Sequence, residues 1–494
     1  MNLIKMNHYP CKREQHFIFT NANKEKILDV IITKNDLQKI REEFYDYILK
    51  DTTFVKHDLT GYKAEIAIEK TLEVIGNNKS FIINPALKMG NMPYYMSCLA
   101  ITNSDNELTF YLFSPVVEKK LYQGDSKKKL CSQYQNIVAI ILNNDMFDKY
   151  DINIKIVRLD NDKNNIQIDY LDDTKFSEKY MNDYAPVFCD NLHLDKEPNY
   201  SRRCKKECKY SSECALPNFS ILDFDLGSGR WKKVDNLIDK YGNLDINNLD
   251  NNEVSELGNM NKMRFELNNK NSNDSSYLID KDVLDSFLGK INQPCIHLDF
   301  EGYTSIYSQP NYWKNAQIIF SYSIHKVDEN NQIKSHSFNI VDPRDNNFES
   351  IIPKLFDDLL GSEPIVVHHK DYEVSRFKDL KKVYPHYSEE IDNIIGRIVD
   401  LEELFINGGF CVKGQKSNSL KDIVSSLNID TYQGLKIVKG DDCAYQYKEM
   451  FDNNVYDKEL IDEIRKYNTA DTLAQIKIID KIKMFLSLKD IRKV

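Results

Sequence analysis

Residues 294–302, with the sequence PCIHLDFEG, constrain the fold of this chain most strongly because apolar and polar side chains alternate along them. Successive side chains of a β-strand point to opposite faces of its sheet. The pattern therefore predicts a buried strand with two unlike faces. The apolar face comprises Ile296, Leu298 and Phe300, and the polar face comprises His297, Asp299 and Glu301.

Two carboxylates, Asp299 and Glu301, thus lie side by side on the polar face of the predicted strand. They repel each other, and divalent metal ions offset such repulsion in the two-metal sites of phosphoryl-transfer enzymes. A solvated strand face is the alternative explanation of the pair. Other parts of the chain must decide between the two.

The length and charge of the chain limit the classes of protein to which it can belong. Its 494 residues exceed one compact core, which suggests two domains and a connector. The net charge of -10 argues against a protein that coats nucleic acid by bulk electrostatics. It does not exclude a nuclease, because metal ions neutralise acidic residues and basic patches can be local.

The sequence predicts no membrane segment. Residues 1–17 lack the continuous apolar run of a signal peptide, and the longest apolar stretch, residues 137–142, is too short to span a bilayer. We therefore expect a soluble cytoplasmic protein without a membrane partner.

Composition divides the chain into three parts. Apolar residues at helical spacing between Val234 and Tyr241 predict a short helix that Gly242 ends. Residues 242–276 are rich in Asn, Asp and Ser, which is typical of a flexible connector. We expect an N-terminal domain at residues 1–216, a helical and Asn-rich connector at 217–289 and a C-terminal domain at 290–494.

Strands alternate with helices in the C-terminal domain. Residues 317–327 and 333–341 predict a hairpin around the turn DENNQ. The amphipathic residues 350–361 predict a helix that ends at a glycine, and residues 365–369 predict a short strand. This order indicates an α/β fold with a mixed sheet.

A further acidic group follows the short strand. A helix is expected to begin near Asp371, which is well placed to be its N-cap. Glu373, Phe377 and Leu380 then share one face of that helix. Glu373 is therefore the better candidate for an inward carboxylate.

The last predicted helix combines apolar residues with one carboxylate. Its stripe consists of Leu460, Ile464, Tyr467, Asp471, Ala474, Ile478, Ile482 and Phe485. Burial of an unpaired charge costs several kcal/mol, so Asp471 needs a partner such as a metal ion or an arginine. A structural salt bridge and a metal site both satisfy that need.

In order, these motifs resemble those of the DEDD 3'-to-5' exonucleases of the ribonuclease-H-like superfamily, in the variant with tyrosine in the last motif. Asp299 and Glu301 match the first motif, Glu373 stands where the second has Asp, and Tyr467 with Asp471 match the third. The resemblance implies an RNase-H-like mixed sheet with flanking helices. It also implies that the four carboxylates bind two Mg²⁺ or Mn²⁺ ions, and that the tyrosine orients the attacking water.

Three further segments resemble an uncharacterised bacterial family, often labelled a domain of unknown function. They are residues 398–405 around Asp400, residues 417–427 around Lys421, and residues 432–447. That family joins a RecB-like nuclease region to an RNase-H-like C-terminal domain. Asp400 is expected to begin or end an inner strand near the site, in a structural or a catalytic role. Ser419 and Lys421 are expected either to reach a phosphate or to form a solvated helix start.

Three cysteines cluster within the sequence RRCKKECKYSSEC. Cys204, Cys208 and Cys214, with the distant Cys11, resemble the iron-sulfur arrangement of RecB-type nucleases. The resemblance implies a [4Fe-4S] cluster that closes the N-terminal domain, with Zn²⁺ as the alternative occupant and free thiols as the remaining possibility. The basic residues around the cluster are expected to contact nucleic acid or simply to be solvated.

A working RecB-type nuclease also needs an Asp and a Glu-x-Lys on adjacent strands. The alignment of predicted strands puts Ser97, Tyr111 and Phe113 at those positions, whereas Gln133 matches the helix that follows. We therefore expect a degenerate PD-(D/E)xK-like α/β domain that binds but does not cut.

The sequence thus predicts a metal-dependent nuclease that degrades single-stranded ends of DNA or RNA from its C-terminal domain. The alternative is a catalytically inactive subunit for nucleic-acid binding or assembly. A metal-cluster scaffold for protein partners is a third possibility, and it would not bind nucleic acid.

Overall fold

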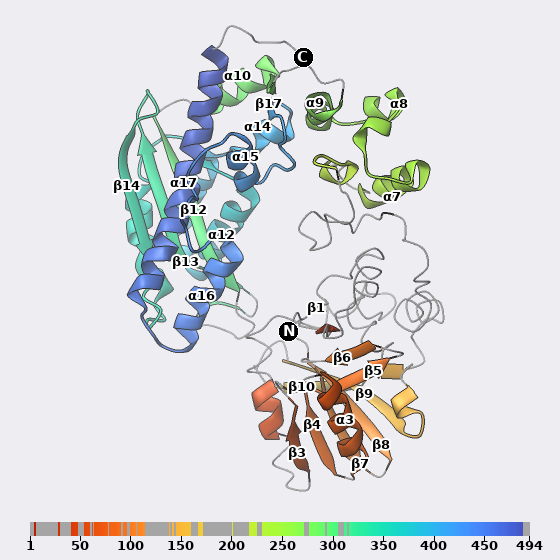
Figure 1. The fold of residues 1–494 in the computed structure, drawn as a ribbon. Helices are drawn as coiled ribbons and strands as arrows, with labels where there is room; N and C mark the ends of the chain where they lie inside the picture. Colours follow the sequence, from red (N-terminus) through yellow and green to blue (C-terminus); the bar gives the residue numbers. More distant parts are fainter. Residues whose placement is uncertain are drawn as a thin grey trace. The chain divides into compact units, whose positions relative to one another are not determined.

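The chain forms two compact units in a computed structural model, Met1–Cys214 and Ala215–Val494 (Figure 1). The model is a mixed α/β protein. The structure describes residues 4–5, 28–29, 41–47, 54–59, 62, 64–77, 79–89, 92–95, 99–104, 106–113, 138, 141–142, 145–159, 166–170, 200, 217–224, 230–270, 276–291, 294–304, 311–313 and 316–487.

The first unit contains a six-stranded sheet in the order β10-β9-β8-β7-β4-β3. Its strands are β3 (Val55–Asp58), β4 (Ser80–Ile83), β7 (Leu99–Ser104), β8 (Glu107–Phe113), β9 (Asp151–Leu159) and β10 (Ile166–Tyr170). A four-stranded sheet follows the order β1 (Ile4–Lys5), β2 (Leu28–Asp29), β6 (Met92–Tyr95) and β5 (Ala86–Met89). Helix α3 (Ala64–Ile75) packs on β4, β5 and β6.

Tyr111 and Phe113, expected at the positions of a catalytic Glu and Lys, are buried in β8. Their rings lie with centroids 4.9 and 5.4 Å from that of Phe44. Both side chains therefore belong to the apolar core of the first unit. Ser97 and Gln133 lie outside the described residues.

The predicted cluster cysteines, Cys11, Cys204, Cys208 and Cys214, also lie outside the described residues. Three other cysteines, Cys295, Cys411 and Cys443, are buried and form no disulfide. They pack as small apolar residues.

A five-stranded mixed sheet organises the second unit, in the order β14-β13-β12-β15-β16. Its strands are β12 (Cys295–Thr304), β13 (Gln317–Val327), β14 (Ile333–Ile340), β15 (Ile365–Val367) and β16 (Ile398–Asp400). The first three pair antiparallel, whereas β15 pairs parallel with both β12 and β16. The predicted hairpin and the predicted strand at residues 294–302 are confirmed.

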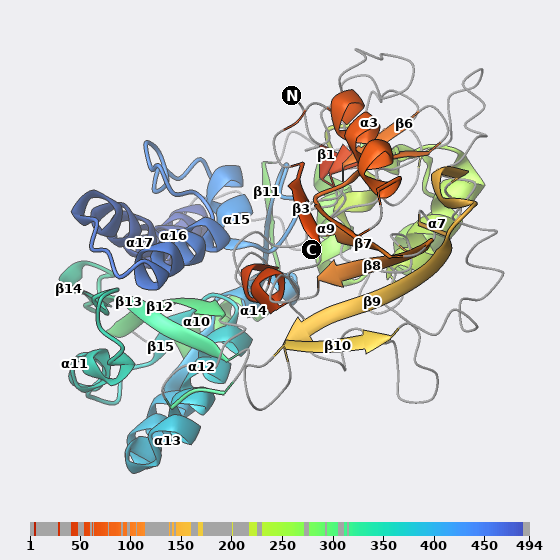
Figure 2. The same ribbon diagram turned by 90° about the horizontal axis from the view of Figure 1, so that it is seen from below.

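Helices cover both faces of this sheet (Figure 2). On one side lie α16 (Gly440–Asp452) and α17 (Lys458–Ser487), and on the other lie α11 (Ile352–Asp358), α12 (Lys370–Val383) and α13 (Ser388–Arg397). The apolar face of β12 meets the second group, as the rings of Phe300 and Phe377 show with centroids 5.1 Å apart. The polar face of β12 therefore lies toward α17.

The expected N-cap of α12 is wrong. Asp371 lies inside the first turn and is exposed, and the N-cap is His369, whose φ is 72°. The Asp400 carboxylate instead accepts hydrogen bonds from the backbone N–H groups of His369 and Lys370, at 3.0 and 2.9 Å. Asp400 ends β16, which is an edge strand of the sheet and not the expected inner strand. It also accepts from the N–H of Glu402 at the start of α14 (Glu402–Ile406). Its structural role is thus to hold the starts of two helices.

The expected flexible connector contains ordered helices in its described part. The helix predicted before Gly242 is α7 (Arg230–Tyr241), followed by α8 (Asn251–Ser255) and α9 (Asn259–Asn268). Met260, Met263 and Leu267 of α9 are buried in the core of the second unit. Strand β11 (Tyr277–Ile279) pairs with β17 (Phe410–Val412), and α10 (Lys281–Lys290) follows. The segment is folded because its few apolar residues are spaced to face one core.

Polar side chains fix the position of α17 on the sheet. Asn468, Thr472 and Gln475 are each fully buried at helical spacing on the side that meets β12 and β13. The Thr472 hydroxyl lies 3.0 Å from Ser323 Oγ and 2.8 Å from His325 Nδ1. Buried polar groups have strict directional partners, so this ladder sets the register of the helix more sharply than apolar contacts alone.

His297 is part of the same ladder. Its Nδ1 lies 3.1 Å from Gln475 Oε1, and Gln475 Nε2 donates to the Leu298 carbonyl at 3.2 Å. An amide oxygen only accepts, so Nδ1 carries the proton. Burial lowers the pKa of His297 to about 4 and that of His325 to about 3, so both imidazoles are neutral near pH 7.

No helix in the described part of the chain is long and apolar enough to cross a membrane. The longest, α17, has 30 residues, but charged residues recur along it. A bilayer core requires about 20 predominantly apolar residues in a row.

Replacement of Gln475 by Leu should lower the free energy of unfolding of the second unit by about 1 to 3 kcal/mol, because it leaves His297 Nδ1–H buried without its partner. Chemical denaturation of the full chain measures this loss. The exposed Glu389 of α13 offers a control, and Glu389→Gln should change stability by less than about 0.5 kcal/mol. Equal stability of the two variants would contradict the ladder.

Candidate metal centre

Three carboxylates converge where β12 meets α17. Asp299 and Glu301 come from the polar face of the strand, and Asp471 comes from the helix. One oxygen of each lies within 4.8 Å of the others. Carboxylate oxygens at such separations are the donor set that hard divalent cations such as Mg²⁺ and Mn²⁺ prefer.

The surroundings disfavour negative charge on these groups. Glu301 and Asp471 are buried, whereas Asp299 is partly exposed and opens the centre to solvent. Burial, followed by the charge of Asp471, raises the pKa of Asp299 and of Glu301 well above their usual range. Burial also raises the pKa of Asp471 to about 6. Three carboxylates this close together repel one another unless a cation binds them or some of them are protonated.

No cationic side chain among the described residues forms an ion pair with any of the three carboxylates. Asn468 Nδ2 donates to Asp299 Oδ2 at 2.5 Å, and the Tyr432 hydroxyl donates to Asp471 Oδ1. The salt bridge that sequence alone allowed for Asp471 is therefore not formed within the described part of the chain.

Glu373 lies near this centre but outside the group of three. It is buried in the first turn of α12, and its Oε2 has no hydrogen-bond partner among the described residues. Burial raises its pKa to about 8, with a smaller contribution from Asp400. Its charge also contributes to the raised pKa of Asp299 and of Glu301, which places it close to both. A buried, unpartnered carboxylate oxygen is suited to a second cation.

Tyr467 reaches the same centre and meets a lysine. The Lys421 ammonium donates to Tyr467 Oη at 2.5 Å and to the Val438 carbonyl at 2.7 Å. Lys421 also counteracts the upward pKa shifts of Glu301 and Asp471. It belongs to α15 (Leu420–Ser426), whose N-cap, Ser419, accepts from the Asp422 N–H.

One glycine allows close approach beside the centre. The pairing of β12 with β13 shifts register between Glu301 and Gly302, and a Cβ on Gly302 would lie 2.9 Å from Tyr372 Oη and 3.0 Å from the Ile318 carbonyl oxygen. Bulges at such places aim side chains, and here the bulge follows the two strand carboxylates directly.

The structure brings together four of the five predicted site residues, Asp299, Glu301, Tyr467 and Asp471, and places Glu373 beside them. Sequence reasoning missed Tyr432 and Asn468. Tyr432 lies in a loop without periodicity, so no signal identified it. The sequence did contain a signal for Asn468, because Asn468, Thr472 and Gln475 form a polar stripe beside the apolar stripe of the same helix.

Comparison with known families adds one match. Residues 296–419 match the model of a domain of unknown function (DUF2779). The match includes residues 398–405, one of the three segments on which the resemblance to such a family was based, but not residues 432–447. The matched segment contains Asp299, Glu301 and Glu373 but neither Tyr467 nor Asp471. No curated protein matches the chain.

Addition of excess Mn²⁺ or Mg²⁺ should raise the melting temperature of the chain by about 5 to 10 °C near pH 7.5, because an ion that binds only the folded centre stabilises it. The rise should shrink as the pH falls through about 6, where Asp471 takes up a proton. Without metal, the pH dependence of stability has the opposite sign. Raised carboxyl pKa values stabilise the folded state at low pH, and this contribution to stability is lost as the pH rises.

Thermal melts with and without metal at several pH values measure both effects. Asp471→Asn should abolish the metal-induced rise, whereas Asp371→Asn, which alters an exposed carboxylate on α12, should retain it. An equal rise in the two variants would contradict a metal centre at Asp471.

Proposed function

We propose that the chain is a metal-dependent nuclease that hydrolyses phosphodiester bonds of DNA or RNA, as a 3'-to-5' exonuclease, at the centre formed by β12 and α17. One observation carries this proposal. Asp299, Glu301 and Asp471 converge within 4.8 Å without an ion-pair partner among the described residues. Such a group of carboxylates is energetically unfavourable unless bound cations neutralise its charge.

The strand order supports the proposal. Three antiparallel strands followed by two parallel ones, with the first strand central, agree with the RNase-H-like sheet that the resemblance implies. The acidic residues also lie at the positions the resemblance assigns: two on the central strand, one at a helix start beside the neighbouring strand, and one on the last helix.

Asp299, Glu301 and Asp471 would hold one divalent ion, and Glu373 would join Asp299 in holding a second. Bound at these positions, the ions would polarise the scissile phosphate and favour ionisation of the attacking water. Asn468 fixes the Asp299 carboxylate from the side of the helix, and Tyr432 fixes that of Asp471. Both ligands are thereby held in place before an ion arrives.

Tyr467 is suited to orient the attacking water. Burial and the neighbouring carboxylates raise the pKa of its hydroxyl, so it remains a neutral donor at any physiological pH. Lys421 donates to its oxygen, and the tyrosine hydrogen is therefore directed away from the ammonium. The charge of Lys421 also acts on Glu301 and Asp471, so Lys421 can offset charge on a phosphate bound there.

We propose that the N-terminal unit is a degenerate RecB-like domain that binds nucleic acid. Cys11, Cys204, Cys208 and Cys214 would hold a [4Fe-4S] cluster, with Zn²⁺ as the alternative, and the enzyme would act in the cytoplasm. Anaerobic purification separates the two metals, because a brown protein with visible absorbance excludes zinc alone. Cleavage of DNA by the chain with Mg²⁺ after loss of Asp299 would contradict a degenerate N-terminal site.

Replacement of Asp299 by Asn should abolish Mg²⁺- or Mn²⁺-dependent degradation of single-stranded DNA and RNA, with a loss of at least about a hundredfold, because it removes a carboxylate that would hold the ions. The assay compares substrates labelled at the 5' and 3' ends, which also reveals the direction of cleavage. Asp371→Asn is the matched control and should retain full activity. If the wild type binds nucleic acid and divalent metal but never cuts, the alternative of an inactive binding subunit replaces this proposal.

Replacement of Tyr467 by Phe should lower kcat by about ten- to a hundredfold with little change in KM, because the hydroxyl acts on the attacking water rather than on substrate affinity. Metal-induced stabilisation should persist in this variant, since no carboxylate is lost. A loss of metal-induced stabilisation equal to that of Asp471→Asn would instead make Tyr467 part of the framework of the centre.

A further inference from the structure

A second tyrosine, Tyr372, reaches the carboxylate centre from the first turn of α12, directly before Glu373. Its side chain is half-buried. A Cβ on Gly302 would lie 2.9 Å from its hydroxyl oxygen, so the hydroxyl reaches the strand residue that follows Glu301. Burial raises the pKa of this hydroxyl, and the charges of Glu301 and Asp299 raise it further. The hydroxyl therefore lies beside the centre and stays protonated at physiological pH.

The hydroxyl of Tyr372 has no hydrogen-bond partner among the described residues. Other donors at the centre are already engaged. Asn468 donates to Asp299. Tyr432 donates to Asp471. A hydroxyl hydrogen without an acceptor in the protein is available to a ligand that brings an acceptor to the centre.

Gly302 makes room for this hydroxyl. The Cβ of any larger residue there would press on the tyrosine oxygen and would also lie 3.0 Å from the Ile318 carbonyl oxygen. A larger residue would therefore displace the tyrosine ring or the strand. The bulge of β12 lies at the same point, between Glu301 and Gly302. The backbone of the strand is thus shaped to admit a hydroxyl group next to a carboxylate of the centre.

Arg376 holds the ring of Tyr372 from the next turn of the helix. Its guanidinium carbon lies 5.2 Å from the ring centroid, within the range of a cation–π contact. The guanidinium group is itself fixed, because it donates to Gln317 Oε1 at 2.5 Å and to Asp379 Oδ2 at 2.7 Å. The charge of Arg376 is therefore paired within the protein, and its role here is to orient the ring.

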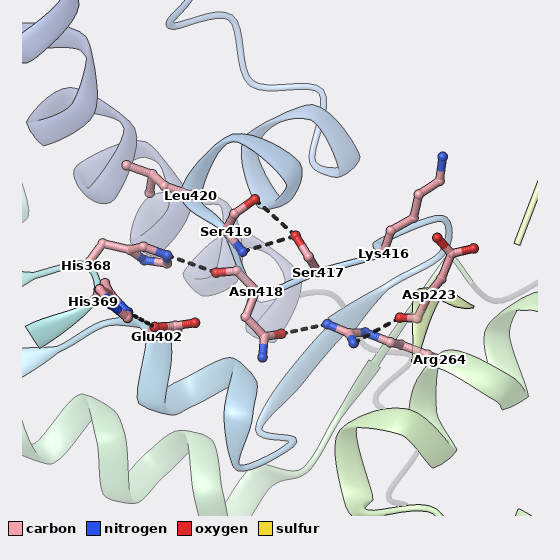
Figure 3. Close-up of a pocket in the computed structure, with 10 residues that line it drawn as sticks. All are labelled: Asp223, Arg264, His368, His369, Glu402, Lys416, Ser417, Asn418, Ser419 and Leu420. Carbon is pink, nitrogen blue, oxygen red and sulfur yellow. Dashed lines mark hydrogen bonds and ion pairs between the residues drawn. The ribbon is translucent and has the colours of Figure 1, made fainter. Parts of the chain in front are cut away.

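Side-chain contacts also hold the start of α12, where it borders a pocket of the second unit (Figure 3). His368 Nε2 donates to the Asn418 carbonyl at 2.9 Å, as Figure 3 shows. His369 Nδ1 lies 3.0 Å from Glu402 Oε2. Tyr372 follows in the first turn, so its backbone is fixed before a ligand arrives. A donor held in this way loses little conformational entropy when it binds.

We propose that Tyr372 is a substrate-binding residue of the carboxylate centre, whose hydroxyl donates a hydrogen bond to an oxygen atom of the nucleotide held there. The inference rests on the proposed nuclease function and adds a residue to its site. A nucleotide at the centre offers two kinds of acceptor, a phosphate oxygen and the terminal sugar hydroxyl. A hydrogen bond to the charged phosphate oxygen is the stronger of the two.

The variant Tyr372→Phe tests the proposal, because it removes the hydroxyl and retains the ring. Cleavage of a single-stranded oligonucleotide by the full chain is measured with Mg²⁺. Binding of the same strand is measured by fluorescence anisotropy with Ca²⁺ in place of Mg²⁺, and electrophoresis verifies that the strand stays intact. Both kcat/KM and the affinity should fall about tenfold in the variant. The metal-induced rise in melting temperature should persist, because no carboxylate is lost.

Tyr456→Phe is the matched control. Tyr456 is an exposed tyrosine that precedes α17, and its ring also contacts an arginine, since Arg344 lies 5.0 Å from the ring centroid. This variant should cleave and bind the strand as the wild type does. Equal melting temperatures of the wild type and the two variants verify that both variants fold.

A strand that ends in a 2',3'-dideoxynucleotide identifies the acceptor. If the loss caused by Tyr372→Phe disappears on this strand, the acceptor is the terminal sugar hydroxyl. If the loss persists, the acceptor is a phosphate oxygen.

Wild-type cleavage and wild-type affinity in Tyr372→Phe overturn the proposal. A wild type that binds the strand more tightly than Tyr372→Phe does, but cuts nothing with Mg²⁺ or Mn²⁺, contradicts the nuclease function alone. A wild type that neither binds nor cuts the strand overturns both.

Discussion

The seating of α17 on the polar face of β12 is the interaction on which the second unit depends. Asn468, Thr472 and Gln475 each find a specific partner on the sheet, and one of those partners is Asp299 itself. A helix held by apolar contacts alone can slide by a turn at modest cost, but a buried polar ladder allows one register. That register brings Asp471 to the strand carboxylates.

The same seating creates an electrostatic cost. Three carboxylates lie together in a partly buried place, and burial raises the pKa of each. The fold retains this cost although apolar residues at these positions would pack more favourably. Electrostatic repulsion of this kind is characteristic of functional sites, where side chains are already positioned for binding and the folded state is less stable as a result.

Much of the centre could be predicted from the sequence because its elements have strong periodicity. The alternation in residues 294–302 and the stripe from Leu460 to Phe485 each contain a carboxylate where an apolar or neutral residue would be ordinary. The N-cap of α12 could not be predicted, since Asp400, which performs that role, is about 30 residues away in sequence. Tyr432 was missed for the same reason, because its role depends on a tertiary contact with Asp471. The ordered helices of the expected connector show that an Asn-rich composition can hide a few well-spaced apolar residues.

The separation of the two halves of the carboxylate centre along the chain has a consequence for synthesis. Asn468 follows Asp299 by 169 residues, so a ribosome that adds about 5 to 20 residues per second makes the second half some ten to thirty seconds after the first. During that interval β12 has no α17 to cover its polar face. The carboxylate centre is therefore assembled only after α17 has been made.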